Sequence, residues 1–117
     1  MKNPWIPFYV GDYLAKTQHL TTVQHGAYFL LILHYWANGS LPTTDKELMA
    51  IARMGEEEWL GNCYTLAKFF DANWRHARLD TDIEKAKKRS KARALAGLKG
   101  AWARHGRPVG KEWQLPT

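Results

Sequence analysis

The sequence has little cysteine and no long hydrophobic run. Its 117 residues include one cysteine, Cys63, which excludes an internal disulfide framework and a cysteine-based zinc site and is compatible with a reducing compartment. The longest apolar stretch, residues 27–33, is far too short to span a bilayer. The first residues contain Pro4 and Pro7 and no long apolar run, so they do not form a signal peptide. We therefore expect a small cytoplasmic domain.

Acidic side chains are missing from residues 85–111, which hold ten basic residues. The net charge of +6 is accordingly uneven: residues 1–70 carry five basic and six acidic side chains, whereas residues 71–117 carry twelve basic and five acidic ones. This asymmetry indicates a near-neutral body with a basic extension. Basic extensions commonly contact phosphate backbones, because the contact releases condensed counterions. The alternatives are a solvated helix face or an acidic protein partner.

Groups that carry catalysis or bind metals are also sparse. The five histidines show no spacing with Asp or Glu that is typical of a zinc site, and no glycine-rich phosphate loop follows a predicted strand. Cys63 lies in an apolar stripe, where a free cysteine behaves as a small buried hydrophobe. We therefore expect a non-enzymatic protein that needs neither a cofactor nor a metal.

The spacing of apolar residues predicts three helices in the body. A capping-box pattern at Thr21 and Gln24 precedes an apolar segment that predicts the central, most buried helix, ending at Asn38-Gly39. A second such pattern at residues 44–47 opens a short helix that ends near residue 55. The third helix follows three consecutive glutamates, which are favourable at a helix N-terminus. Its apolar stripe consists of Trp59, Cys63, Leu66 and Phe70.

Two further segments complete the predicted fold. Residues 4–10 combine prolines with large apolar side chains, so we expect an extended arm that covers part of the core, followed by a helical turn near Tyr13. Asp71-Ala72-Asn73 is typical of a turn, and Phe69-Phe70 before it and residues 74–79 after it predict a two-stranded ribbon. Three helices followed by a ribbon is the element order of a winged helix. The predicted fold is mainly α and winged-helix-like, with a small β-ribbon wing.

The predicted organisation has two parts. Residues 1–84 form a winged-helix-like domain with an extended aromatic N-terminal arm, and residues 85–117 form a basic C-terminal helix and tail. A third capping-box pattern, at Thr81 and Glu84, predicts the start of this helix.

Several motifs follow one another in an order that resembles a known family. They are Pro7-Phe8-Tyr9-Val10-Gly11-Asp12-Tyr13, His19-Leu20-Thr21, Gly26-Ala27-Tyr28, Leu30-Leu31, Leu41-Pro42, Trp74-Arg75-His76-Ala77-Arg78-Leu79-Asp80 and the Ala/Gly/Lys-rich segment from Lys91 to Arg104. Together they are similar to the YdaU-like family of uncharacterised phage and prophage proteins over nearly the whole chain. The resemblance implies a winged-helix-like domain of the kind found at the N-terminus of phage replication proteins. It also implies an origin in a phage, prophage or related mobile element, hence the cytoplasm of a bacterial host, and it does not imply an enzyme.

The predicted basic helix is the strongest candidate for contact with nucleic acid. Lys85, Lys88 and Arg89 share one side of it, because residues three and four apart are neighbours on a helix surface. The predicted wing adds two arginines; the alternative is that Trp74 and Leu79 close the core while these arginines pair with Asp71, Asp80 or Asp82. The candidate nucleic-acid-binding residues are Arg75, Arg78, Lys85, Lys87, Lys88, Arg89, Lys91, Arg93, Lys99, Arg104 and Arg107. Such contacts predict DNA binding with weak sequence preference and steep salt dependence.

The third helix is a poor element for reading DNA. Its N-terminal residues, which would approach base edges in a helix-turn-helix, are Glu56, Glu57 and Glu58, and carboxylates repel phosphates. These glutamates and Trp102 are instead candidate contacts for a protein partner, since aromatic residues carry much interface energy; the alternative for Trp102 is docking onto the body. The sequence therefore supports two alternative functions. One is a DNA-binding protein in replication or a linked DNA-processing step, and the other is an adaptor for a phage replication or packaging component such as a small terminase subunit.

Overall fold

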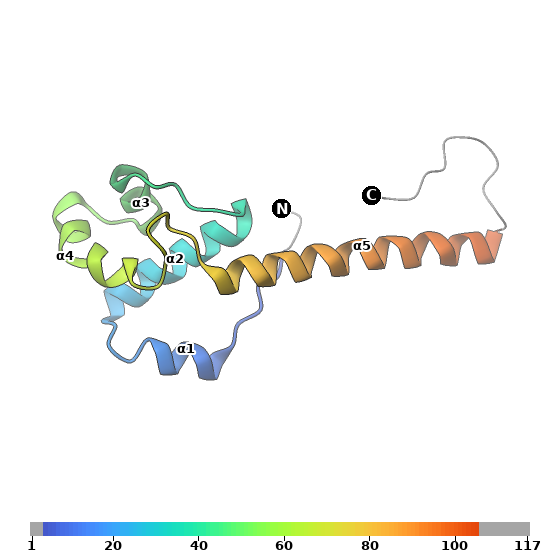
Figure 1. Ribbon diagram of the computed structural model, residues 1–117, viewed down its shortest axis with the longest axis horizontal. Helices are drawn as coiled ribbons and strands as arrows, with labels where there is room; N and C mark the ends of the chain where they lie inside the picture. The colour runs from blue at the N-terminus through green and yellow to red at the C-terminus, as the bar shows by residue number, and fades with distance from the viewer. Residues whose placement is uncertain (1–3, 106–117) are drawn as a thin grey trace. The chain divides into compact units, whose positions relative to one another are not determined.

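The computed structural model describes residues 4–105, with side chains for residues 4–101. Over this range the regular elements are α1 (Val10–Lys16), α2 (Thr22–Asn38), α3 (Asp45–Ala52), α4 (Glu56–Ala67) and α5 (Ala77–His105), as Figure 1 shows. The chain divides into two compact units, Met1–Ile83 and Glu84–Thr117. The first unit contains α1 to α4 and the beginning of α5, and the second contains the rest of α5. Within the described range, none of the five helices has both the length and the hydrophobicity that crossing a bilayer requires.

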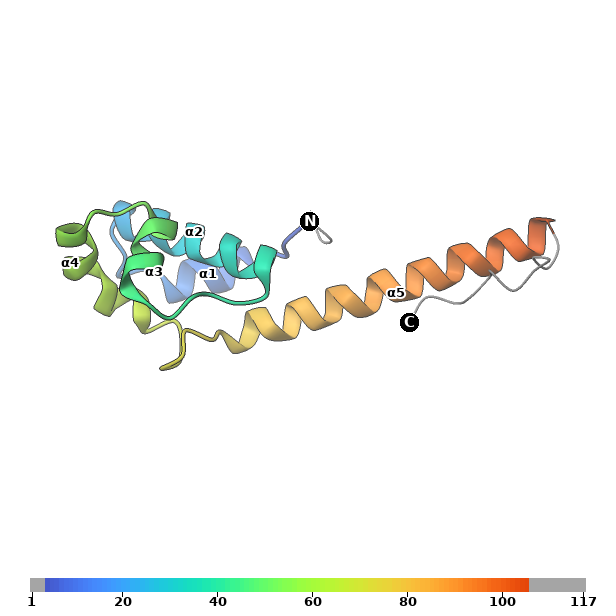
Figure 2. The same ribbon diagram turned by 90° about the horizontal axis from the view of Figure 1, so that it is seen from above.

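Helix α2 is the centre of the first unit. It begins with a complete capping box, in which the Thr21 hydroxyl accepts the Gln24 N–H and the Gln24 side chain accepts the Thr21 N–H. It ends at Gly39, which adopts the left-handed conformation with φ of 81°, where glycine carries no Cβ penalty. The helix packs against α3 and α4 and lies between α1 and α3 (Figure 1 and Figure 2), and Leu31 and Tyr35 are fully buried in it. The predicted central helix and its two end signals are confirmed.

Helix α4 supplies the largest fully buried side chain, Trp59. The Trp59 indole N–H donates to Asp45 Oδ1 at 3.0 Å, which ties α4 to the first turn of α3. The predicted apolar stripe is confirmed at Trp59 and Leu66, both fully buried, whereas Cys63 and Phe70 are half-buried and Phe70 lies beyond the helix end. Burial of large rings and branched aliphatic groups stabilises the fold.

The predicted β-ribbon wing is wrong. No β-strand occurs in residues 4–105, and the segment expected to form the second strand leads into α5 at Ala77. Asp71 organises the preceding loop: its Oδ1 accepts the backbone N–H groups of Asn73 and Arg75 at 2.8 and 2.9 Å, and Trp74 adopts a left-handed φ of 57°. The carboxylate thus satisfies N–H groups that a strand would have given to a ladder. Because a winged helix requires this β-ribbon, the predicted winged-helix fold is also wrong, and the first unit is a helical domain.

The start of α5 also differs from the prediction. His76 precedes the helix, and its Nδ1 accepts the Leu79 N–H at 3.2 Å, which is the bond that an N-cap side chain makes. Thr81 lies inside the helix, where its hydroxyl donates to the Ala77 carbonyl at 3.0 Å. A threonine in a helix interior commonly bonds back to the preceding turn, so the capping-box pattern at Thr81 does not start this helix.

The aromatic arm before α1 is more exposed than predicted. Trp5 is 80% exposed, and Phe8 and Tyr9 are also exposed. The ring of Phe8 contacts Tyr13 of α1 and Phe29 of α2 at centroid distances of 5.0 and 6.1 Å, and the Tyr9 hydroxyl donates to a carboxylate of α5. It therefore rests on the body without closing the core.

Candidate functional site

The part of α5 in the second unit is basic and solvent-exposed. Residues 85–101 include seven basic side chains and no acidic one, and all seven are exposed. They are Lys85, Lys87, Lys88, Arg89, Lys91, Arg93 and Lys99. None of them forms an ion pair with a carboxylate of the part of the chain that the structure describes. At 1.5 Å per residue, the charged stretch is about 21 Å long.

Five of these cations form one face. At 3.6 residues per turn, an arc of about 140° contains them all. We call this set the basic face of α5: Lys85, Lys88, Arg89, Arg93 and Lys99. Ala92 and Ala96 fall within the same arc, so small side chains separate the cations and permit a close approach to a partner, while the half-buried Leu95 and Leu98 fall outside it. The basic face is therefore a strip of positive charge that has no carboxylate partner among the described side chains.

The other predicted contact residues are distributed differently. Glu56, Glu57 and Glu58 are exposed in the first turn of α4. Trp102 and Arg104 lie in α5, but their side chains are outside the described set, and Arg107 lies outside the described residues altogether.

Arg75 is committed to contacts within the first unit. Its Nη2 lies 2.6 Å from Asp80 Oδ1, and its Nη1 donates to the Gly39 carbonyl at 3.3 Å. The guanidinium also lies over the ring of Tyr35, 5.1 Å from its centroid. The end of α2 is thereby joined to the start of α5, and pairing of this arginine with a nearby aspartate is confirmed.

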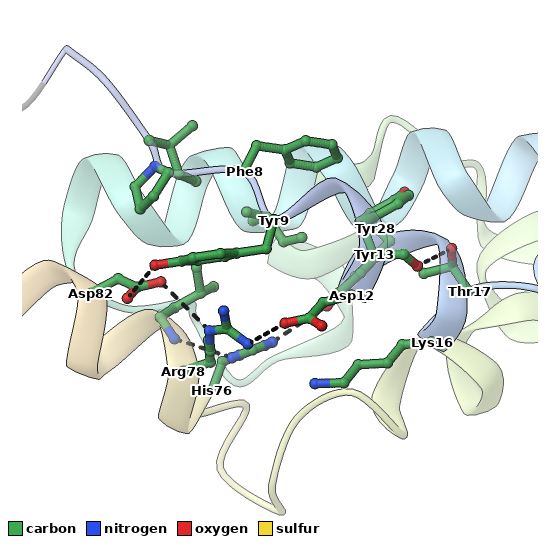
Figure 3. A pocket seen from close by; sticks show the side chains of 14 residues that line it. Phe8, Tyr9, Asp12, Tyr13, Lys16, Thr17, Tyr28, His76, Arg78 and Asp82 are labelled. Carbon is green, nitrogen blue, oxygen red and sulfur yellow. Dashed lines mark hydrogen bonds and ion pairs between the residues drawn. The ribbon is translucent and has the colours of Figure 1, made fainter.

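Arg78 joins three segments of the first unit, as Figure 3 shows. Its Nη1 donates to Asp12 Oδ2 of α1 at 2.8 Å, its Nε lies 4.0 Å from Asp82 Oδ2, and its guanidinium lies 3.8 Å from the centroid of the Tyr9 ring. The hydrogen bond and the charge of Arg78 lower the pKa of Asp12. The Tyr9 hydroxyl donates to Asp82 Oδ1 at 3.3 Å. The sequence offered Asp82 as one of three alternative partners for the two arginines, and sequence reasoning missed Asp12, which lies 66 positions from Arg78.

A pocket of about 100 Å³ adjoins the Arg78 cluster (Figure 3). Its lining includes Lys16 and His76, and the His76 Nε2 lies 3.3 Å from the Tyr28 hydroxyl. Burial, with a smaller contribution from the positive charge of Lys16, lowers the pKa of His76, so this ring is predominantly neutral at pH 7. Burial, with a smaller contribution from Tyr13, raises the pKa of Tyr28 to about 12. Sequence reasoning assigned no role to Lys16, because a single lysine in a short helix carries no motif.

Comparison with known proteins places the first unit in a family. Residues 4–84 match a family model described as "Protein of unknown function (DUF1376)". The protein described as "Uncharacterized protein YdaU", from Escherichia coli (strain K12), is 36% identical over 107 residues, which are 89% of this chain and 37% of that protein. The chain therefore spans little more than a third of the length of this relative. No solved structure matches the chain.

Proposed function

The chain belongs to the DUF1376 family, as its YdaU-like motifs predicted, and because neither description states a function, we propose one from the residues themselves. We propose that it is a non-enzymatic protein that binds duplex DNA through the basic face of α5. The observation that supports the proposal is the strip of five exposed cations without carboxylate partners among the described side chains. Arg75 and Arg78, which the sequence predicted as nucleic-acid-binding residues, are not part of the proposed DNA-binding face, because both already have carboxylate partners within the first unit.

Phosphate is the group that such a strip suits best. Duplex DNA carries one negative charge per about 1.7 Å of its axis, and each phosphate that a lysine or arginine neutralises releases counterions. A helix of about 10–12 Å diameter fits the major groove, which is about 12 Å wide. The strip has no Asn or Gln for reading adenine, alanines fill the spaces between its cations, and Arg89 and Arg93 are its only arginines, a side-chain type that reads guanine. Binding is therefore expected to depend weakly on sequence.

We assign this binding to DNA replication, or to a linked DNA-processing step, of a phage or related mobile element in a bacterial cytoplasm. The support is the resemblance of the motifs to phage and prophage proteins. A protein that holds duplex DNA without reading its sequence suits a positioning role, in which the DNA is presented to other proteins.

The proposal is tested with paired charge variants of the full chain. The variant Lys88→Gln/Arg89→Gln removes two cations from the basic face, and the matched control Lys46→Gln/Lys68→Gln removes two exposed cations from the first unit. Fluorescence anisotropy of a labelled duplex is measured at about 0.1 M salt. The helix variant is expected to bind about 10- to 50-fold more weakly, because each lost phosphate contact removes roughly one unit of slope against log salt. Equal losses in both variants would contradict the assignment to α5.

A second candidate function, a protein–protein adaptor, is favoured by the exposed face of α4. Leu60 and Tyr64 are 64% and 75% exposed, and with Glu56 they are spaced four residues apart on one side of this helix. Exposed apolar side chains that share a face mark interaction surfaces. In this case the partner is a phage replication or packaging component. Failure of the full chain to bind either duplex or single-stranded DNA near about 0.15 M salt would favour this candidate.

A further inference from the structure

We propose that one exposed face of α4 is a docking surface for the basic face of α5 from a second copy of the chain. The contact uses the cations that bind phosphate in the function proposed above, so it withholds them until duplex DNA displaces the second copy. This regulation of the DNA-binding face rests on the proposed function, whereas the contact between two copies does not depend on it.

Two apolar side chains and two carboxylates form this face of α4. At 3.6 residues per turn, an arc of about 100° contains four exposed residues, which we call the docking face: Glu56, Glu57, Leu60 and Tyr64. Among the described large apolar side chains, only Trp5 is more exposed than Tyr64 and Leu60. The positive end of the helix dipole accounts for glutamates in a first turn, but it does not account for exposed apolar groups beside them. The combination therefore indicates a surface that a partner covers.

The charges of the docking face select the partner. Neither of its glutamates forms an ion pair with the described part of the chain. The nearest cations in the sequence are Arg53 and Lys68, and the ammonium group of Lys68 lies over the Tyr64 ring, 4.8 Å from its centroid. The basic face of α5 carries the opposite charge and also lacks a carboxylate partner among the described side chains. A second copy therefore supplies the charge that each face lacks.

The two faces also match in size and spacing. Leu60 and Tyr64 are four residues apart on α4, and the two alanines within the basic face, Ala92 and Ala96, are four residues apart on α5. Large side chains on one helix that lie opposite small ones on the other let the two helices pack with their axes about 8–10 Å apart. The apolar contacts are then flanked by the ion pairs.

A parallel arrangement of the two helices satisfies both matches in one register, because each helix rises about 1.5 Å per residue. When the glutamates of the docking face lie level with Lys88 and Arg89, its two apolar side chains lie level with the two alanines. With the same apolar contacts, the reverse direction brings the glutamates level with Lys99 alone. The parallel register pairs more charges and is therefore favoured.

Sedimentation velocity of the full chain without DNA tests the contact. The weight-average mass is expected to rise between about 10 µM and about 1 mM protein, the range in which weak contacts between exposed surfaces dissociate. Raising the salt concentration about tenfold is expected to weaken the association about fivefold or more, because screened charges attract less. A mass that stays that of one chain over this range would overturn the proposal.

Variants with exchanged charges assign the two faces. Glu56→Lys/Glu57→Lys and Lys88→Glu/Arg89→Glu are each expected to weaken self-association about tenfold or more, because each places like charges opposite one another. An equimolar mixture of the two variants is expected to associate again, since the first keeps the cations of α5 and the second keeps the carboxylates of α4. A mixture that associates no better than either variant alone overturns the proposal.

Two comparisons separate docking on this face from general charge attraction. Glu57→Lys and Glu58→Lys make the same charge change in the same turn, but Glu58 lies outside the docking face, so Glu57→Lys is expected to weaken the association more. Tyr64→Ala leaves the charge unchanged and is expected to weaken the association about threefold or more. Equal effects of the two charge variants, or no effect of Tyr64→Ala, contradict the docking face. Far-ultraviolet circular dichroism shows whether each variant is folded.

A short DNA duplex distinguishes failure of this proposal from failure of the proposed function. If both hold, adding the duplex is expected to dissociate the second copy, because both partners need the basic face of α5. Self-association without DNA binding would contradict the proposed function and leave the contact intact. DNA binding without self-association would overturn the contact alone, and self-association that persists on bound DNA would overturn the regulation.

Discussion

Replacing Trp59 by alanine is expected to lower the free energy of unfolding by about 3–5 kcal/mol. The ring is fully buried, its indole N–H donates to Asp45 Oδ1 at 3.0 Å, and its centroid lies 6.0 Å from that of Trp74. The substitution removes the largest buried side chain and leaves an acceptor in α3 without its donor. Because a domain has only about 5–15 kcal/mol of stability in total, the variant is expected to be marginally folded. Urea unfolding followed by circular dichroism measures the loss.

Two neighbouring variants control this prediction. Leu60→Ala changes a side chain that is 64% exposed and is expected to alter stability by no more than about 0.5 kcal/mol. Trp59→Phe keeps a buried ring but loses the hydrogen bond to Asp45 and part of the packing, so an intermediate loss is expected, and it remains measurable if the alanine variant does not fold. A loss below about 1 kcal/mol for Trp59→Ala would contradict the placement of this ring at the centre of the core.

Alkaline pH is expected to destabilise the first unit through Tyr28. Burial raises the pKa of this hydroxyl from 10.0 to about 12, so the folded state holds the proton more tightly than the unfolded state. The resulting stability is fully present below the unfolded pKa near 10 and is lost as the pH rises towards 12. Two pKa units correspond to about 2–3 kcal/mol. Urea unfolding at a series of pH values between 9 and 12 measures this loss.

The matched control is Tyr28→Phe, which keeps the buried ring and removes the titrating group. Its stability is expected to fall less steeply over the same pH range, and the difference from the unchanged chain isolates Tyr28 from the other alkaline titrations. At pH 7 the variant is expected to lose about 1 kcal/mol, since the hydroxyl lies 3.3 Å from His76 Nε2. Identical pH profiles for the two chains would show that Tyr28 is not buried as described.

Local signals predicted much of the helical body. The capping box of Thr21 and Gln24 and the left-handed Gly39 fix both ends of α2 with bonds between residues at most four positions apart. The N-cap Thr44 of α3 works over the same short range, as its hydroxyl accepts the Glu47 N–H. Such hydrogen bonds join residues that are close in the chain, so they can be predicted from the sequence alone.

The wing was predicted wrongly because aromatic and apolar residues near a turn do not distinguish a strand from a loop that leads into a helix. The deciding contacts are the two N–H groups that Asp71 binds and the N-cap formed by His76. Histidine is an uncommon N-cap, so the sequence held no strong start signal at residue 76. The threonine three residues before Glu84 was a stronger pattern, but it lies inside α5.

The two candidate sites differ in how far the sequence predicts them. The basic face of α5 belongs to one helix, so its composition and spacing are visible without a structure. The Arg78 cluster and the pocket bring together the arm, α1, α2 and the start of α5. Residues as far apart as Tyr9 and Asp82 meet there through tertiary packing, and no spacing rule relates them.

The most direct test of the central claim is the salt dependence of DNA binding by the full chain. If the basic face contacts about five phosphates, the logarithm of the binding constant is expected to fall with the logarithm of the salt concentration at a slope of about −4 to −5. Removing Lys88 and Arg89 is expected to reduce that slope to about −2 to −3. A slope near zero, or a slope that this double substitution leaves unchanged, would contradict phosphate binding by α5.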